Sequence, residues 1–257
     1  MAHRFEIAKD LVVDASPEQV WEAIATGPGM DSWFMGRSEI EPREGGTARW
    51  SIGGYTEDAT VTAWDPPRRL VSTGSPSPDG SFHQFEYRIE GRDGGGTGIR
   101  YEHSGMLGGD WEAEYDAMNE GDPMYLHKLV QYLTYFRGRF AAPVDAQGPQ
   151  VPDRVRAMTV FERGLGLDGE VAEGDHVRLI PEGLGAIEGV VDYVSPHFLG
   201  VRTSDALYRF IHGFDGTVMV GHHLFADGVD REEAERAWRA WLDRLFDPSG
   251  GGAGSPG

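Results

Sequence analysis

The stretch DASPEQVWEAIATGPGMDSWF (residues 14–34) carries the clearest local signals for the fold. Ser16 can cap a helix, Pro17 stands at the first helical position, and Gln19 lies three residues after the cap. Serine followed three residues later by glutamine is the capping-box pattern, and proline is favoured at the first helical position. The glycines and proline of TGPG then predict where this helix ends.

Three bulky side chains follow that turn, namely Trp33, Phe34 and Met35. Two roles are open for them. They can fill a core, or they can line the mouth of a cavity, because ligand sites are mostly apolar with a few placed polar groups.

Strands are expected on both sides of this stretch. Before it, RFEIAKDLVVDA places apolar residues on one face at alternating positions, which predicts a strand. After it, a meander of strands is expected near Arg37–Glu41, Thr47–Ile52, Ala59–Ala63, Arg69–Thr73, Phe82–Glu90 and Thr97–Ser104.

The last two of these strands form the clearest hairpin. They are joined by the glycine-rich loop GRDGGGTG. Alternation puts one set of side chains on a single face: His83, Phe85, Tyr87, Ile89, Ile99, Tyr101 and His103. The opposite face is charged, which is typical of an antiparallel sheet covered on one side.

Two helices are expected next, over Trp111–Asn119 and Pro123–Phe140. The second carries an apolar stripe that includes Leu126, Leu129 and Phe140. This longer helix is the expected cover of the sheet's apolar face.

Composition excludes several classes of protein. The 257 residues carry a formal net charge of -19 with a pI near 4.8, which disfavours nucleic acid and anionic membranes as partners. Cysteine is absent, so disulfides and thiolate chemistry are excluded. No apolar run approaches the ~20 residues of a membrane span, and we expect a cytoplasmic protein. Lysine occurs only at Lys9 and Lys128, a bias that suits a G+C-rich bacterial genome.

The second half of the chain echoes the first. Two segments of the second half have counterparts in the first: residues 186–204 resemble residues 58–75, and residues 216–230 resemble residues 96–110. In each half an amphipathic helix follows the second segment. We therefore expect an internal repeat whose second copy lacks an obvious first strand and a counterpart of the helix that begins at Trp111. In this repeat His223 takes the place of His103. Ala141–Gln150 reads as a linker, and the segment after Asp247 as a disordered tail.

The order of these features resembles the START-like (SRPBCC) superfamily, and within it the heat-shock-protein-90 ATPase activator C-terminal-domain-like family. The resemblance is carried by these residues: Ser16-Pro17-Glu18, Val20-Trp21, Trp33-Phe34, Trp64-Asp65-Pro66-Pro67 with Leu70, Trp111, and Leu126 with Leu133. It covers residues 3–140 well and residues 153–246 weakly.

This resemblance implies an α+β helix-grip fold, in which a curved antiparallel sheet wraps a long C-terminal helix around a cavity. It predicts a START-like ligand-binding domain over residues 1–142 and a truncated START-like repeat over residues 151–247. Residues 248–257 would form the disordered tail.

The expected ligand-binding residues come from the covered face, the lid helix and the cavity rim: Trp33, Phe34, Met35, Phe85, Tyr87, Tyr101, Trp111, Tyr125 and Leu129. His103, Tyr101 and His83 are the candidate catalytic residues. An imidazole titrates near neutral pH and can act as an acid or base, and a tyrosine hydroxyl can donate to a developing enolate. The alternative for these histidines is a hydrogen-bonded place in the core.

No metal site and no cofactor are expected. His212, His222 and His223 invite a zinc hypothesis, but alternation puts His212 and His223 on one face and His222 on the other. Three ligands at about 2.0–2.1 Å do not follow from that arrangement.

Two classes of function remain. The first is binding of a small apolar or aromatic molecule, with cyclase- or lyase-type chemistry as an extension. The second is a chaperone-activator-like interaction module with a protein partner.

Overall fold

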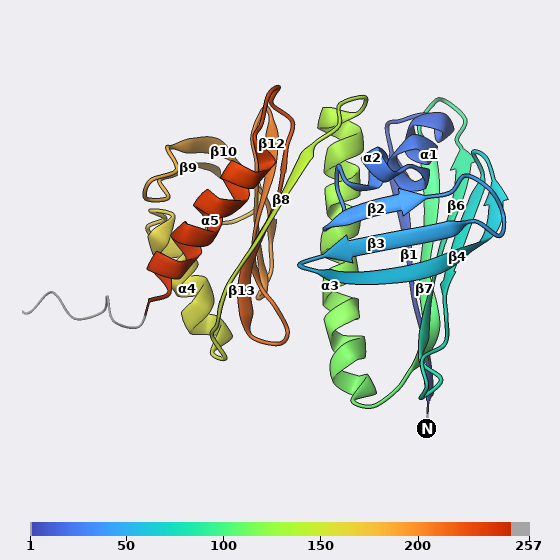
Figure 1. Ribbon diagram of the computed structural model, residues 1–257. Coiled ribbons are helices and arrows are strands. Elements are labelled where there is room, and N and C mark those ends of the chain that lie inside the picture. The colour runs from blue at the N-terminus through green and yellow to red at the C-terminus, as the bar shows by residue number, and fades with distance from the viewer. Residues whose placement is uncertain (1, 248–257) are drawn as a thin grey trace, which may run out of the picture. The chain divides into compact units, whose positions relative to one another are not determined.

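The computed structural model describes residues 2–247, and the expected tail over residues 248–257 lies outside them. The chain divides into two compact units, Met1–Ala141 and Ala142–Gly257 (Figure 1). Each unit is built from one antiparallel sheet and the helices that pack on it. No helix among residues 2–247 is long and apolar enough to cross a membrane.

The first unit has a seven-stranded sheet. Its elements are β1 (His3–Val13), α1 (Pro17–Ala25), α2 (Gly27–Met30), β2 (Arg37–Ile40), β3 (Thr47–Ile52), β4 (Tyr55–Asp65), β5 (Arg69–Gly74), β6 (Phe82–Gly91), β7 (Thr97–Leu107), α3 (Trp111–Gln131) and the π-helical turn η1 (Tyr132–Phe136). The strand order is β1-β7-β6-β5-β4-β3-β2, with every neighbouring pair antiparallel. The first strand therefore pairs with the last one.

The capping box predicted at the start of α1 is present. The Ser16 hydroxyl accepts the Gln19 amide at 3.3 Å, and the Gln19 side chain accepts the Ser16 amide at 2.9 Å. The indole of Trp33 donates to the carbonyl of Ala23 at 2.9 Å, and the ring is only 1% exposed. Trp33 is therefore an interior residue that ties the turn to α1, and not a rim residue.

One long helix, α3, replaces the two helices expected after the sheet. It runs from Trp111 to Gln131 without a break and carries Pro123 in its interior. Proline forfeits one helical hydrogen bond, but tertiary packing overrides that local preference, and Met124 and Leu129, which follow it on the helix, are buried. Phe140, expected on this helix from the sequence, lies beyond it and is exposed.

The second unit has a six-stranded sheet. Its elements are β8 (Ala142–Gln150), α4 (Arg154–Gly164), β9 (His176–Leu179), β10 (Ile187–Val194), β11 (Phe198–Arg202), β12 (Ala206–His212), β13 (Thr217–Leu224) and α5 (Arg231–Leu245). The strand order is β8-β13-β12-β11-β10-β9, so its first strand also pairs with its last.

The expected linker is wrong, because Ala142–Gln150 forms β8 and pairs with β13. Pro143, Gly148 and Pro149 give this segment the composition of a linker. Strand β8 is the edge strand of its sheet, where proline is tolerated because one row of amides needs no partner in the sheet. The second copy therefore keeps its first strand.

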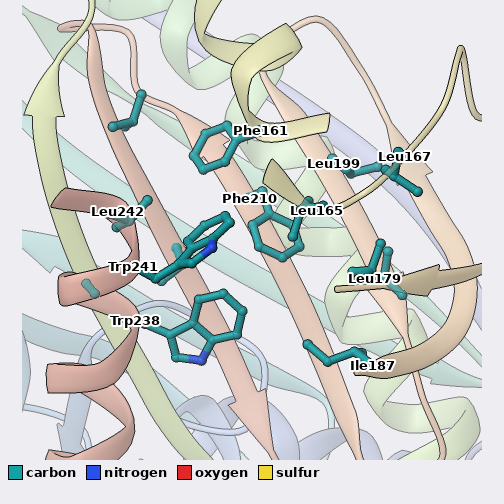
Figure 2. Close-up of a cluster of buried hydrophobic side chains, with 14 of the residues drawn as sticks. Phe161, Leu165, Leu167, Leu179, Ile187, Leu199, Phe210, Trp238, Trp241 and Leu242 are labelled. Atoms are coloured by element: carbon teal, nitrogen blue, oxygen red, sulfur yellow. The ribbon is translucent and has the colours of Figure 1, made fainter. Parts of the chain in front are cut away.

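Helices α4 and α5 cover one face of the second sheet (Figure 1). Figure 2 shows Phe161 of α4 and Trp238 and Trp241 of α5 gathered around Phe210 of β12. All four rings are buried, and they belong to one apolar cluster of this unit. The shared order of first strand, helix, antiparallel meander and final helix makes the two units a repeat of the helix-grip type.

Candidate functional site

Four polar side chains of the first unit form one continuous chain of interacting groups. His83 Nδ1 lies 3.0 Å from His103 Nε2, and His103 Nδ1 lies 2.9 Å from Asp122 Oδ2. At the other end, His83 Nε2 lies 3.3 Å from Glu114 Oε1. Two imidazoles therefore stand in line between two carboxylates.

Strand register and the unbroken helix bring these groups together. Phe85 of β6 faces His103 of β7, and His83 faces Gly105. Glu114 and Asp122 both come from α3. Gly105 has a φ of 151°, and a Cβ there would lie 2.1 Å from the Phe82 carbonyl oxygen, so the strand requires glycine beside His83.

Aromatic rings surround the buried imidazole. Phe85 stacks on His103 with ring centres 4.2 Å apart, and Phe5 of β1 meets the His103 ring edge-on at 5.0 Å. Tyr101 lies 6.5 Å from His103, and Tyr87 lies 5.3 Å from Tyr101. The inward alternation predicted for this hairpin is confirmed by these contacts.

Exposure differs between the two ends of this chain of groups. The side chains of Glu114 and His83 are 45% and 26% exposed, whereas those of Asp122 and His103 are 14% and 5% exposed. The Glu114 end is therefore open to solvent, and the Asp122 end lies inside the unit.

Burial governs the acid–base state of the neighbouring groups. Burial, and then the charge of Asp122, raise the pKa of Tyr87 and of Tyr101, so both phenols stay protonated and can donate hydrogen bonds. Burial, and then the nearby His103, lower the pKa of His83, while Glu114 and Glu57 act in the opposite direction. A neutral His83 is therefore favoured at neutral pH.

The remaining expected residues form other groups. Phe34 packs against Tyr125 with ring centres 4.9 Å apart, and the Tyr125 hydroxyl donates to the sulfur of Met35 at 2.9 Å. Leu129 is fully buried on α3. Trp111 stacks on His3 at 4.5 Å and packs at the edge of a small cluster of β1 and β7.

Sequence reasoning missed Asp122 and Glu114. The sequence Gly121-Asp122-Pro123 reads as a break between two helices, which leaves Asp122 in a loop. If a single helix is assumed to run through Asp122, its carboxylates belong to the helix that covers the histidine-bearing face of the sheet. Such carboxylates opposite histidines indicate a candidate functional site.

No metal centre or phosphate cradle emerges in the described part of the chain. Among residues 2–247, no group of three or more histidine or carboxylate side chains is placed to hold a metal ion. A surface depression of about 330 Å³ is lined by Glu39, Ile40, Glu41, Pro42, Thr47 and Arg49. None of the candidate residues lines it.

The second unit carries a different histidine at the corresponding place. The expectation that His223 matches His103 is wrong, because His222 is the residue that faces α5, with its ring 4.4 Å from Trp238. His212 pairs with Val218, which puts His212 on the face of His222 and not of His223. The alignment of the two copies is shifted by one residue at the glycines of the hairpin loops. A shift of one residue moves every side chain of a strand to the opposite face of the sheet. Where His103 meets the carboxylate of Asp122, His222 meets an indole.

Comparison with known families agrees with this architecture. Residues 14–134 match the model of the family described as activator of Hsp90 ATPase homolog 1-like protein. The first unit is similar to this family over most of its length. This confirms the resemblance predicted from the sequence, and the matched residues run from just before α1 to the first residues of η1. No similar sequence was found among curated proteins.

Several solved structures are similar to this chain at low identity. Protein MLL2253 from Mesorhizobium loti is 23% identical, with a TM-score of 0.45, covering 50% of this chain and 96% of its own. The Aha1 dimer from Colwellia psychrerythraea is 22% identical, with a TM-score of 0.44, covering 52% and 99%. DynU16, described from the dynemicin biosynthetic locus, is 19% identical, with a TM-score of 0.43, covering 93% and 96%.

Proposed function

We propose that the first unit binds a small, largely apolar or aromatic molecule beside Phe85, Tyr101 and His103. The observation that carries this proposal is the buried pairing of His103 with Asp122 at 2.9 Å, set among aromatic rings. A mostly apolar wall with a few oriented polar groups is the usual composition of a ligand site. Similarity to the Hsp90 ATPase activator-like family, whose fold is START-like, supports the same interpretation.

The polar groups suit acid–base chemistry on such a molecule. Asp122 accepts a hydrogen bond from His103 and so holds the imidazole in one orientation, as carboxylates do for catalytic histidines. Tyr101 stays protonated and can donate to an oxygen that gains negative charge. We therefore propose proton transfer in a cyclase- or lyase-type reaction, with His83 and His103 as the acid–base pair.

Binding can be tested with an apolar aromatic probe that quenches tryptophan fluorescence. We expect micromolar affinity, about -8 kcal/mol, and a large loss in Phe85→Ala and in Tyr101→Asp. Phe140→Ala is the matched control, because Phe140 lies outside the site and is 52% exposed. If Phe85→Ala and Tyr101→Asp stay folded and bind as the natural protein does, the ligand site is elsewhere.

Catalysis needs a separate test. His103→Gln keeps a hydrogen-bonding side chain but removes the base, so the turnover of any compound the protein converts should fall about a hundredfold or more. A folded variant with unchanged turnover would remove His103 from the chemistry.

A chaperone-activator-like role is the second candidate, and the family description favours it. The outer face of the first sheet is charged in its centre, where Arg69 and Arg88 both pair with Glu86 at 2.8 and 2.6 Å. Such a face suits a polar protein contact better than an apolar one. Stimulation of an Hsp90 ATPase by the purified chain, unchanged by Phe85→Ala, would favour this role over ligand binding.

A further inference from the structure

We propose that Glu114 and His83 form a proton pathway between solvent and His103, with Asp122 as the positioning residue that fixes the tautomer of His103. The proposal rests on the acid–base role proposed for His103 and adds how that group is supplied with protons. The geometry that carries it is the unbroken line of polar atoms from exposed Glu114 to buried Asp122.

The hydrogen positions follow from the carboxylate at the buried end. An ionised carboxylate only accepts hydrogen bonds, so His103 Nδ1 carries a proton directed at Asp122. In a neutral imidazole the other nitrogen is then an acceptor, so His103 Nε2 presents its lone pair to His83. His83 Nδ1 must therefore carry the proton shared across the 3.0 Å contact.

Proton transfer along this line balances. A proton from solvent is added to His83 Nε2, beside Glu114, and gives an imidazolium. The proton on His83 Nδ1 then moves to His103 Nε2, which leaves His83 neutral with its proton on Nε2. Each cycle takes one proton from solvent and places one on His103. The reverse steps restore both first tautomers: His103 Nε2 returns its proton to His83 Nδ1, and His83 Nε2 releases its proton to water.

The groups around His83 allow it to be protonated transiently but do not hold it in the protonated form. Glu114 from α3 and Glu57 from β4 favour the protonated form, whereas burial and the neighbouring His103 from β7 oppose it. The uncharged ring of Phe5 of β1 lies tilted against the His83 ring, with ring centres 5.6 Å apart. His103 in turn faces Asp122 and Tyr101. A proton that enters at His83 is therefore passed on and not retained.

The test uses ligand-free protein labelled with ¹⁵N-histidine. Nitrogen chemical shifts and long-range couplings report which ring nitrogen carries the proton, and exchange spectroscopy reports how fast the His103 ring proton exchanges with water. We expect His103 to be protonated on Nδ1. His83→Asn keeps an amide donor near the place of Nδ1 but cannot relay a proton, so the exchange should slow by about tenfold or more.

Glu114→Gln removes only the charge at the open end, and it should lower the pKa of His83 and slow the same exchange. Glu112→Gln is the matched control, since Glu112 is exposed on the same helix outside the chain of groups, and it should change neither quantity.

Unchanged exchange in both His83→Asn and Glu114→Gln would overturn the pathway, as would a His103 ring protonated on Nε2. If His83→Asn fails to fold, Glu114→Gln decides alone, because Glu114 is half exposed. Failure of the natural protein to bind the probe, or unchanged binding in Phe85→Ala and Tyr101→Asp, would contradict the proposed function without affecting these measurements.

Discussion

Replacing Phe161 with alanine tests the core of the second unit. The ring is fully buried and lies 5.9 Å from Phe210, 6.1 Å from Trp241 and 5.0 Å from Phe246. Burial of a phenylalanine contributes about 1.5–3 kcal/mol, and each ring pair adds about 0.5–1.5 kcal/mol. Because neighbouring rings relax into part of the void, we expect a loss of about 3–5 kcal/mol in unfolding free energy.

A loss of that size should lower the melting temperature of a unit this small by about 12 °C or more. Urea unfolding measured by near-ultraviolet circular dichroism gives the free energy, and hydrogen exchange of β12 peptides assigns it to this unit. Val155→Ala is the control, because Val155 is 69% exposed on the same helix and should change stability by no more than about 0.5 kcal/mol. A cost below about 1 kcal/mol for Phe161→Ala would refute the packing described for this cluster.

Three further outcomes can be checked by urea unfolding. Burial lowers the pKa of His83 in the folded protein, so below a pH of about 6.5 the unfolded chain takes up a proton at His83 before the folded chain does. The free energy of unfolding should therefore decrease as the pH is lowered, by up to about 1.4 kcal/mol per pH unit. His83→Gln should remove this contribution to the pH dependence. Ser16→Ala should cost about 1 kcal/mol by removing the cap of α1, and no measurable change would mean that the capping box is dispensable. Gly105→Ala should cost more than about 1 kcal/mol, because its Cβ would meet the Phe82 carbonyl, whereas Gly121→Ala in an open part of α3 should be tolerated.

Local signals predict most of the first unit. The capping box of α1 and the alternation of the β6–β7 hairpin both rest on contacts within a few residues or across one tight turn, and the structure has both. The same alternation is enough to place His83, Tyr101 and His103 together on the covered face of the sheet.

The features that sequence reasoning missed depend on partners far along the chain. Strand β8 is stabilised by pairing with β13, about seventy residues further along the chain. The prolines of β8 indicate only that this segment cannot lie in the middle of a sheet. Likewise, Pro123 signals a helix break locally, and only packing on the sheet keeps α3 continuous through Asp122. The carboxylates of the candidate site depend on that continuous helix, so local signals could not reveal them.

The pairing of β1 with β7 has a consequence for how the protein is made. These strands are about a hundred residues apart, so at about 5–20 residues per second β1 leaves the ribosome some 5–20 s before its partner exists. During that interval the apolar side chains of Phe5 and Ile7, buried in the finished unit, have no sheet to cover them. A newly synthesised chain therefore carries an unpaired β1 strand until most of the first unit has been translated. Molecular chaperones that bind extended apolar segments would meet it at that stage.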